Sequence, residues 1–248
     1  MSNHGYRQFC PVAMAAELLE PRWTMLVLSE MWGGSTRFSE IQRGVPGMSP
    51  SLLARRLREM EAKGLVTRRA GPEGPIDYRT TPLADELEPL VQALGAWAHR
   101  NLDPDLQLEC LDHHLLMWNI RRRIAADALP RRKVVVQFIL KVRGEPDRDY
   151  WLIARPDGAT DLCMIDPRFD VDLYVSADLR ALTSAWMGHS SFEGEIAAGR
   201  IALIGDAGLA RSMPRWLRRS GFAPSAMESG AGTAHASIST RPSRSVTG

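Results

Sequence analysis

Apolar positions in the first hundred residues recur with the spacing of amphipathic helices. The clearest case has Leu53, Leu57 and Met60 on one stripe, while Ser49 suits the start of the helix and Gly64 suits its end. The pattern predicts helices over 11–19, 22–32, 37–42, 49–63 and 82–102, and strands over 65–69 and 76–80.

The pattern changes near Asp103, where strand-like runs become more frequent. Turn residues separate these runs. The second part predicts helices over 108–129, 177–187 and 209–217, and strands over 134–140, 150–154, 160–165, 171–175 and 201–204. The last segment is rich in Ala, Ser, Gly, Thr and Pro and lacks aromatic residues, so it predicts a disordered tail. We therefore expect an α+β protein with domains at 1–102 and 103–222 and a tail at 223–248.

Composition excludes several classes of protein. The 248 residues are 44% hydrophobic with a net charge of +2, which rules out a wholly disordered chain and a collagen-like fibre. Three scattered cysteines cannot form a disulfide framework. The amino-terminal residues lack an apolar signal region, and no segment approaches the ~20 apolar residues of a membrane span, so we expect a cytoplasmic protein that does not enter a membrane.

The helix over 49–63 carries a second face, on which Ser51, Arg55 and Arg58 share the same spacing. A short helix, a turn, this polar-faced helix and a basic hairpin follow one another in the order of a winged helix-turn-helix. Such a helix fits the DNA major groove, where arginine pairs with guanine, and hairpin arginines contact phosphates. A merely solvated helix face is the alternative, which the order of elements disfavours. The candidate DNA-binding residues are Arg37, Ser39, Ser49, Ser51, Arg55, Arg56, Arg58, Arg68, Arg69 and Arg79.

Several motifs in this part occur together in one order. They are Cys10-Pro-Val12, Arg22-Trp-Thr-Met-Leu26, Arg37-Phe-Ser-Glu-Ile41, Pro46-Gly-Met-Ser49, Leu53-Ala-Arg-Arg-Leu57, Glu61-Ala-Lys-Gly-Leu-Val66 and Asp77-Tyr-Arg-Thr-Thr-Pro82. From about Cys10 to Leu102 the chain resembles the HxlR-type winged-helix regulators. The resemblance implies a bacterial transcription factor that binds double-stranded operator DNA as a homodimer. Thr80 and Ala84 depart from the usual pattern, away from the expected DNA face.

The helix over 82–102 has a coiled-coil-like seam with spacings of four, three, four and three residues. The seam residues are Leu83, Leu87, Leu90, Leu94 and Trp97. Pro89 is expected to lie inside this helix and to kink it. Packing within one subunit is the plain alternative, but the resemblance favours a dimer contact shared with the first helix. A dimer would place two recognition helices about one DNA turn, ~34 Å, apart.

Cys10 is a candidate redox residue, because some members of the family sense oxidants through a cysteine near this position. Arg7 is close in sequence, and basic neighbours make a thiolate more reactive. A small, partly buried structural cysteine is the alternative.

The second part is similar to the sterol-carrier-protein-like (SCP2-like) fold in three stretches, Val171–Val175, Ala177–Met187 and Glu195–Asp206. The resemblance implies an apolar tunnel for acyl chains or sterol-like ligands. Each bulky apolar side chain, taken alone, also suits an ordinary core. The candidate lining residues are Trp118, Phe138, Leu140, Trp151, Tyr174, Trp186, Met187, Phe192 and Trp216.

The sequence disfavours an enzyme, because no nucleophile elbow, phosphate loop or dinucleotide fingerprint is present. His113 and His114, near Glu109 and Asp112, lack the metalloprotease motif, and adjacent helical side chains are expected to point apart. Four aspartates lack calcium-loop spacing, namely Asp161, Asp166, Asp170 and Asp172. We expect no catalytic residue, metal or cofactor.

These observations favour a homodimeric, sequence-specific DNA-binding regulator modulated by an apolar small molecule. The alternative is a soluble carrier of lipids or other apolar ligands, whose winged helix mediates protein contacts. In a third interpretation the second domain serves only assembly and binds no ligand.

Overall fold

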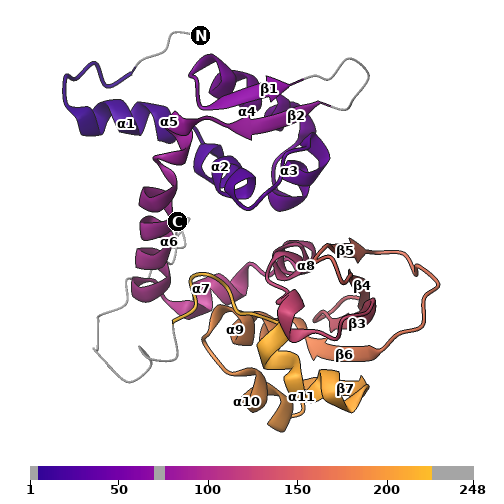
Figure 1. The fold of residues 1–248 in the computed structure, drawn as a ribbon. Helices are drawn as coiled ribbons and strands as arrows, with labels where there is room; N and C mark the ends of the chain where they lie inside the picture. The colour runs from indigo at the N-terminus through magenta and orange to yellow at the C-terminus, as the bar shows by residue number, and fades with distance from the viewer. Residues whose placement is uncertain (1–4, 70–75, 225–248) are drawn as a thin grey trace. The chain divides into compact units, whose positions relative to one another are not determined.

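The computed structural model describes residues 5–69 and 76–224 and divides the chain into two compact units, Met1–Leu94 and Gly95–Gly248 (Figure 1). The division falls inside a helix that begins at Glu88. The disordered tail predicted over 223–248 lies outside the described residues, apart from Ala223 and Pro224.

The first unit contains the predicted helices and hairpin. They are α1 (Pro11–Leu19), α2 (Thr24–Trp32), α3 (Phe38–Gly44), α4 (Pro50–Ala62), β1 (Val66–Arg69), β2 (Asp77–Thr80) and α5 (Pro82–Asp85), with α6 (Glu88–Asn101) crossing the division. Side chains of α2, α3, α4 and β1 form one buried core, which includes the predicted stripe of Leu53, Leu57 and Met60. Antiparallel pairing of Val66 with Thr80 sets the register of the hairpin.

Two helix starts differ from the prediction. The second helix begins at Thr24 rather than Arg22, because Trp23 has a φ of 83°, in the left-handed region that a helix excludes. The first helix has its predicted bounds but contains no buried residue. Val12, which the apolar pattern assigned to its inner face, is 75% exposed.

The predicted helix over 82–102 is two helices, which corrects the expectation of a kink at Pro89. The chain turns at Glu86 and Leu87, and Pro89 lies in the first turn of α6. Proline cannot donate to the carbonyl four residues earlier and its ring clashes there, so it kinks or breaks the interior of a helix. In a first turn the missing N–H has no cost, and the Val91 N–H resumes the helical pattern at the Leu87 carbonyl, 3.0 Å away.

The second unit is a five-stranded sheet with helices. Its remaining elements are α7 (Pro104–Glu109), α8 (His113–Arg122), the short 3₁₀ helix η1 (Ala126–Ala128), β3 (Val134–Lys141), β4 (Arg148–Ala154), β5 (Thr160–Cys163), β6 (Leu173–Asp178), α9 (Leu179–Met187), α10 (Phe192–Ala197), β7 (Ile201–Gly205) and α11 (Ala207–Trp216). The strand order is β5-β4-β3-β6-β7, with only β3 and β6 parallel. The α+β expectation therefore holds for the described residues.

One predicted helix, over 108–129, is replaced by the end of α7, by α8 and by η1. Asp112 interrupts it because its carboxylate accepts the Leu115 N–H at 2.9 Å and begins α8 as an N-cap. Helices α8, α9 and α11 share one buried core with the sheet. No helix among the described residues is long and apolar enough to cross a membrane.

Candidate nucleic-acid interface

Helix α4 has a buried face and an exposed face. Its start is capped by Ser49, whose hydroxyl accepts the Leu52 N–H at 3.3 Å. Ser51, Arg55 and Arg58 lie on the exposed side, as predicted from their spacing. The guanidinium of Arg55 is 3.8 Å from Glu59, and 61% of the Arg55 side chain is exposed. The helix therefore presents a hydroxyl and two guanidinium groups to solvent.

Arg56 differs from its neighbours on α4. Only 12% of its side chain is exposed, and its guanidinium contacts the Glu59 carboxylate at 2.5 Å. Arg56 is therefore turned toward the helix surface, while Arg55 and Arg58 remain available to a partner.

The start of α3 is joined to the hairpin. The Glu40 carboxylate accepts the N–H groups of Thr36 and Arg37 at 3.0 and 3.1 Å, which caps α3, and Ser39 is exposed in its first turn. The Tyr78 N–H donates to the Thr36 carbonyl at 2.7 Å. The hairpin is thereby held against the helix-turn-helix.

The hairpin carries three of the candidate phosphate contacts. Arg68 and Arg69 are exposed at the end of β1, next to the segment 70–75, which lies outside the described residues. Arg79 and Asp77 both belong to β2, and the Arg79 Nε–H donates to the Asp77 carboxylate at 2.8 Å. A hydrogen bond from Thr36 and the nearby Arg79 guanidinium lower the pKa of Asp77. Asp77 therefore stays ionised and offsets part of the positive charge on this face.

Two supporting contacts were not indicated by the sequence. The carboxylate of Glu30 is buried at the end of α2 and accepts the Ser35 hydroxyl at 2.7 Å. A Cβ at Gly44 would lie about 2 Å from that carboxyl, so a larger residue at the end of α3 would displace the Glu30 side chain. The Trp32 indole donates to Asp85 at 3.2 Å and joins α2 to α5. A buried glutamate cannot be distinguished from a surface glutamate by sequence pattern alone.

Comparisons with known proteins identify the first unit. A family model described as HxlR-like helix-turn-helix matches residues 18–106. The chain is 36% identical over 100 residues to the uncharacterized HTH-type transcriptional regulator YvaP of Bacillus subtilis (strain 168), covering 39% of this chain and 93% of that protein. The chain belongs to the HxlR-like helix-turn-helix family.

Two further relatives agree with this assignment. The HTH-type transcriptional regulator YodB of Bacillus subtilis (strain 168) is 35% identical over 98 residues, covering 38% of this chain and 88% of YodB. The uncharacterized HTH-type transcriptional regulator YtfH of Escherichia coli (strain K12) is 32% identical over 99 residues, covering 39% of this chain and 79% of YtfH. The family match ends at residue 106, before the sheet of the second unit.

The predicted seam of this HxlR-like chain is exposed. Four of its five side chains, those of Leu83, Leu90, Leu94 and Trp97, are between 46% and 64% exposed. Leu87 is half-buried against the core of the first unit. Helix α6 has no buried residue, so packing against the core of the first unit accounts for Leu87 and leaves the other four seam side chains exposed.

Cys10 lies at the start of α1. Its sulfur is contacted by the backbone N–H groups of Ala13 and Val12, which lower the pKa of the thiol. Cys10 is half-buried and forms no disulfide. These contacts, rather than Arg7, favour the thiolate.

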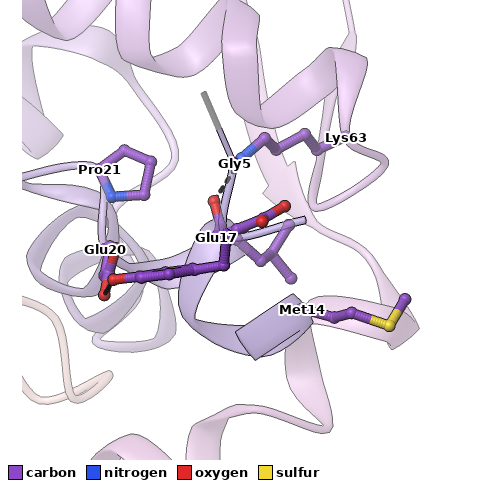
Figure 2. Close-up of a pocket in the computed structure, with 8 residues that line it drawn as sticks. Gly5, Met14, Glu17, Glu20, Pro21 and Lys63 are labelled. Carbon is purple, nitrogen blue, oxygen red and sulfur yellow. Dashed lines mark hydrogen bonds between the residues drawn. The ribbon is translucent and has the colours of Figure 1, made fainter. Parts of the chain in front are cut away.

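An open cavity of about 680 Å³ lies beside α1, as Figure 2 shows. The Lys63 ammonium donates to the Glu17 carbonyl at 3.1 Å, and the Tyr6 hydroxyl donates to the Glu20 carboxylate. That hydrogen bond raises the pKa of Tyr6. Met14 also lines the cavity and is itself exposed, so the lining includes both apolar and polar groups.

The nine candidate ligand-lining residues of the second unit do not line one cavity, and five of them (Phe138, Leu140, Trp186, Phe192 and Trp216) lie in its buried core. Six are buried (Trp118, Phe138, Leu140, Trp186, Phe192 and Trp216), Trp151 and Met187 are half-buried, and Tyr174 is 38% exposed. A cavity of about 300 Å³ lies between α8 and α9, and of these nine residues only Trp186 and Met187 line it. Residues that the sequence did not single out complete its wall, namely Cys110, Leu111, Asp112, Leu115, Leu116, Asn119 and Thr183.

His113 and His114 do not point apart, which corrects the sequence-based expectation. Their Nδ1 atoms lie 2.6 and 2.7 Å from the hydroxyl of Tyr150. Both residues lie in the first turn of α8, and the buried Tyr150 hydroxyl reaches the space between the two rings. Burial raises the pKa of Tyr150, and burial followed by the nearby His114 lowers the pKa of His113.

Three of the four aspartates considered for calcium have partners in the structure. Asp161 pairs with Arg155, and Asp166 accepts the Arg168 N–H at 2.8 Å. Asp172 pairs with Arg132. No metal-binding group of three or more His, Cys, Asp or Glu side chains occurs among the described residues.

Proposed function

We propose that the protein is a sequence-specific, double-stranded DNA-binding transcriptional regulator. The observation that carries this proposal is the exposed row of Ser51, Arg55 and Arg58 on α4, opposite a fully buried apolar stripe. A helix of this kind enters the major groove, and arginine forms paired hydrogen bonds with guanine there. The neighbouring Arg37, Ser39, Arg68, Arg69 and Arg79 are assigned to the DNA backbone.

We propose that the regulator acts as a homodimer through α6 and α1. Exposed apolar side chains follow α6 at Leu90, Leu94 and Trp97, and α1 exposes Val12 and Met14. Such side chains are stabilised when a second copy removes them from water. Two copies related by a twofold axis would read a palindromic operator.

We propose that the second unit is a sterol-carrier-like domain that takes an apolar small molecule in the cavity between α8 and α9. Leu111, Leu115, Leu116, Trp186 and Met187 supply its apolar wall. A ligand alters DNA affinity only if it binds the two states of the protein differently, typically by about 1–3 kcal/mol. The expected observation is an apolar compound retained by the purified protein, detected by native mass spectrometry, and repeated failure to detect or bind one rejects this role.

The DNA proposal is tested with two arginines one residue apart. Both arginines pair with Glu59, but 61% of the Arg55 side chain is exposed against 12% for Arg56. Arg55→Ala should therefore weaken binding to the intergenic DNA upstream of the gene by about 1–3 kcal/mol. Arg56→Ala should weaken it less. Fluorescence anisotropy with native and scrambled duplexes at two salt concentrations measures both effects.

The carrier alternative makes a different prediction for the same experiment. Wild-type protein would then bind native and scrambled DNA equally, and added salt would abolish both. A clear preference for the native duplex that persists as salt rises rejects the carrier interpretation. An assembly-only second unit would leave the DNA result unchanged and would retain no apolar compound.

A further inference from the structure

Two segments of the second unit, 123–133 and 206–219, are strongly basic. Together they contain eight arginine or lysine residues and two aspartates. The basic residues are Arg123, Arg131, Arg132, Lys133, Arg211, Arg215, Arg218 and Arg219. All except Arg219 are exposed, so the charge is on the surface of the unit. We call these eight residues the basic surface.

The fold brings the two segments together although they are far apart in the sequence. Ile124 and Leu217 form an antiparallel bridge. The Arg218 N–H donates to the Arg123 carbonyl at 3.1 Å. The Arg123 side chain donates to the Arg219 carbonyl at 3.0 Å. These contacts join the two segments at Arg123, Arg218 and Arg219, and the guanidinium groups of Arg132 and Arg211 both act on Asp206.

Helix α11 directs its own charges outward. It buries Leu209, Met213 and Trp216 in the core. Arg211 and Arg215, which are spaced by one helical turn, lie on the exposed side. An arginine on the opposite side of a buried stripe is free to contact a partner without disturbing the packing.

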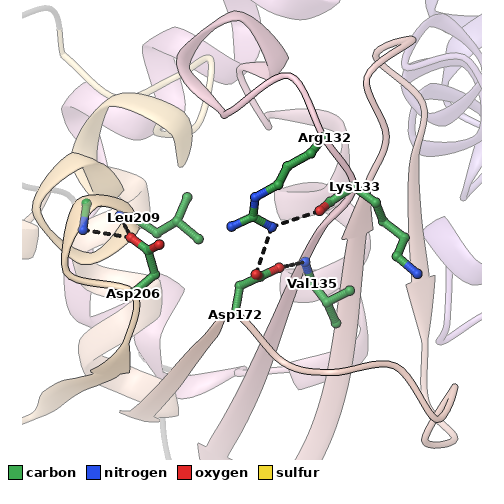
Figure 3. Close-up of polar contacts among 7 residues, drawn as sticks. Arg132, Lys133, Val135, Asp172, Asp206 and Leu209 are labelled. Carbon is green, nitrogen blue, oxygen red and sulfur yellow. Dashed lines mark hydrogen bonds and ion pairs between the residues drawn. The ribbon is translucent and has the colours of Figure 1, made fainter.

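The neighbouring carboxylates are already occupied, as Figure 3 shows. Asp172 accepts Arg132 at 2.7 Å and the Val135 N–H at 2.8 Å. Asp206 accepts the Leu209 N–H at 2.9 Å and caps α11. Among the residues that the structure describes, Arg131 and Arg215 have no ion-pair partner.

We propose that the basic surface binds the phosphate backbone of DNA outside the bases read by α4. This inference rests on the proposed DNA-binding function and adds a second contact region to it. Phosphates are the partner because a covalently attached unit is held near the duplex once α4 is bound, at a high effective concentration. An anionic membrane fits less well, because the exposed residues of α11 include no bulky apolar side chain that could enter a lipid surface.

Phosphate contacts carry no sequence information, which distinguishes the basic surface from α4. Neutralising an arginine of the basic surface should weaken binding to every duplex by the same factor. Removing one arginine–phosphate interaction should also lower the slope of log affinity against log salt by about 1.

The test uses the full chain and two double variants. Arg131→Gln with Arg215→Gln removes two charges from the basic surface. Lys141→Gln with Arg143→Gln is the matched control, since both residues are exposed at the opposite end of β3. Equal thermal unfolding midpoints first show that both variants fold. Affinities are then measured over a series of salt concentrations on native upstream DNA and on a scrambled duplex of equal length.

For the Arg131→Gln, Arg215→Gln variant we expect a smaller slope of log affinity against log salt and an equal loss of affinity on both duplexes. The control variant should keep the wild-type slope and affinities. Equal slopes for the two variants would overturn the inference. Flotation with phosphatidylglycerol vesicles provides a second arm, and loss of vesicle binding without loss of DNA binding would also overturn it. If wild-type protein shows no preference for native DNA while the slopes still differ, the sequence-specific function fails and the backbone contact stands.

Discussion

The two units differ in where their candidate residues lie. In the first unit, Arg55 and Arg58 were predicted on an exposed face of α4 and lie there. In the second unit, Phe138 and Trp216 were candidates for a ligand tunnel and lie in the core. The difference follows from chemistry, because an unpaired guanidinium is too costly to bury whereas an aromatic side chain is stabilised in a core or in a pocket.

The largest effect that tests this comparison is expected at Trp216. Its side chain is fully buried and its indole donates to the Leu209 carbonyl at 2.9 Å. Trp216→Ala should destabilise the second unit by about 3–5 kcal/mol, because it leaves a cavity in the core. Urea unfolding followed by circular dichroism measures the change. A wild-type midpoint would mean that Trp216 lines a ligand space instead.

A second large effect concerns the α6 seam. Leu90→Glu places a charge among the exposed apolar side chains that we assign to the dimer contact. It should weaken dimerisation by about 2 kcal/mol or more, which raises the dimer dissociation constant about thirtyfold. Sedimentation velocity measures the shift toward monomer. Gln92→Glu is the matched control, because Gln92 is exposed on α6 outside the seam. Equal behaviour of the two variants would exclude the seam from the dimer contact.

Much of the fold follows from periodicity, and the exceptions have local causes. The bounds of α1 and the capped start of α4 were predictable, because Pro11, Ser49 and Pro50 are strong local signals. The break before α6 required knowing that Pro89 acts as a first-turn residue, and the late start of α2 depends on the left-handed Trp23. Both exceptions are matters of local backbone conformation, which the spacing of apolar residues does not record.

The candidate sites were also predictable to different degrees. Spacing placed Arg56 beside the DNA face, but only the structure shows that Glu59 holds it. The basic surface was missed because its two segments are separated by more than seventy residues and meet only through the Ile124–Leu217 bridge. A charge cluster assembled from distant segments leaves no local pattern.

A smaller effect is expected at Cys10. Because two backbone N–H groups lower its thiol pKa, alkylation by iodoacetamide should reach half its maximal rate at a lower pH than that of a free cysteine derivative. The measurement uses a Cys110→Ser, Cys163→Ser background, so that only Cys10 reacts. If oxidation of this protein leaves its affinity for upstream DNA unchanged, Cys10 is reactive without being a sensor.

The smallest effect is expected at His113 in the second unit. Burial, followed by the nearby His114 and Arg148, lowers the His113 pKa, while Asp112 and Glu145 oppose the shift. The unfolded chain then takes up a proton more readily than the folded one as the pH falls below the ordinary histidine value of about 6.5. The stabilisation contributed by neutral His113 is therefore complete above that pH and is lost below it.

His113→Gln should accordingly reduce the loss of stability between pH 7.5 and pH 5.5, measured as the shift of the urea midpoint of the second unit. The matched variant is Tyr150→Phe, which keeps His113 but removes the hydroxyl shared with His114. If wild type and His113→Gln lose the same stability over this range, the half-buried imidazole of His113 does not set the pH dependence. The second unit would then resemble the first, whose described residues include no histidine.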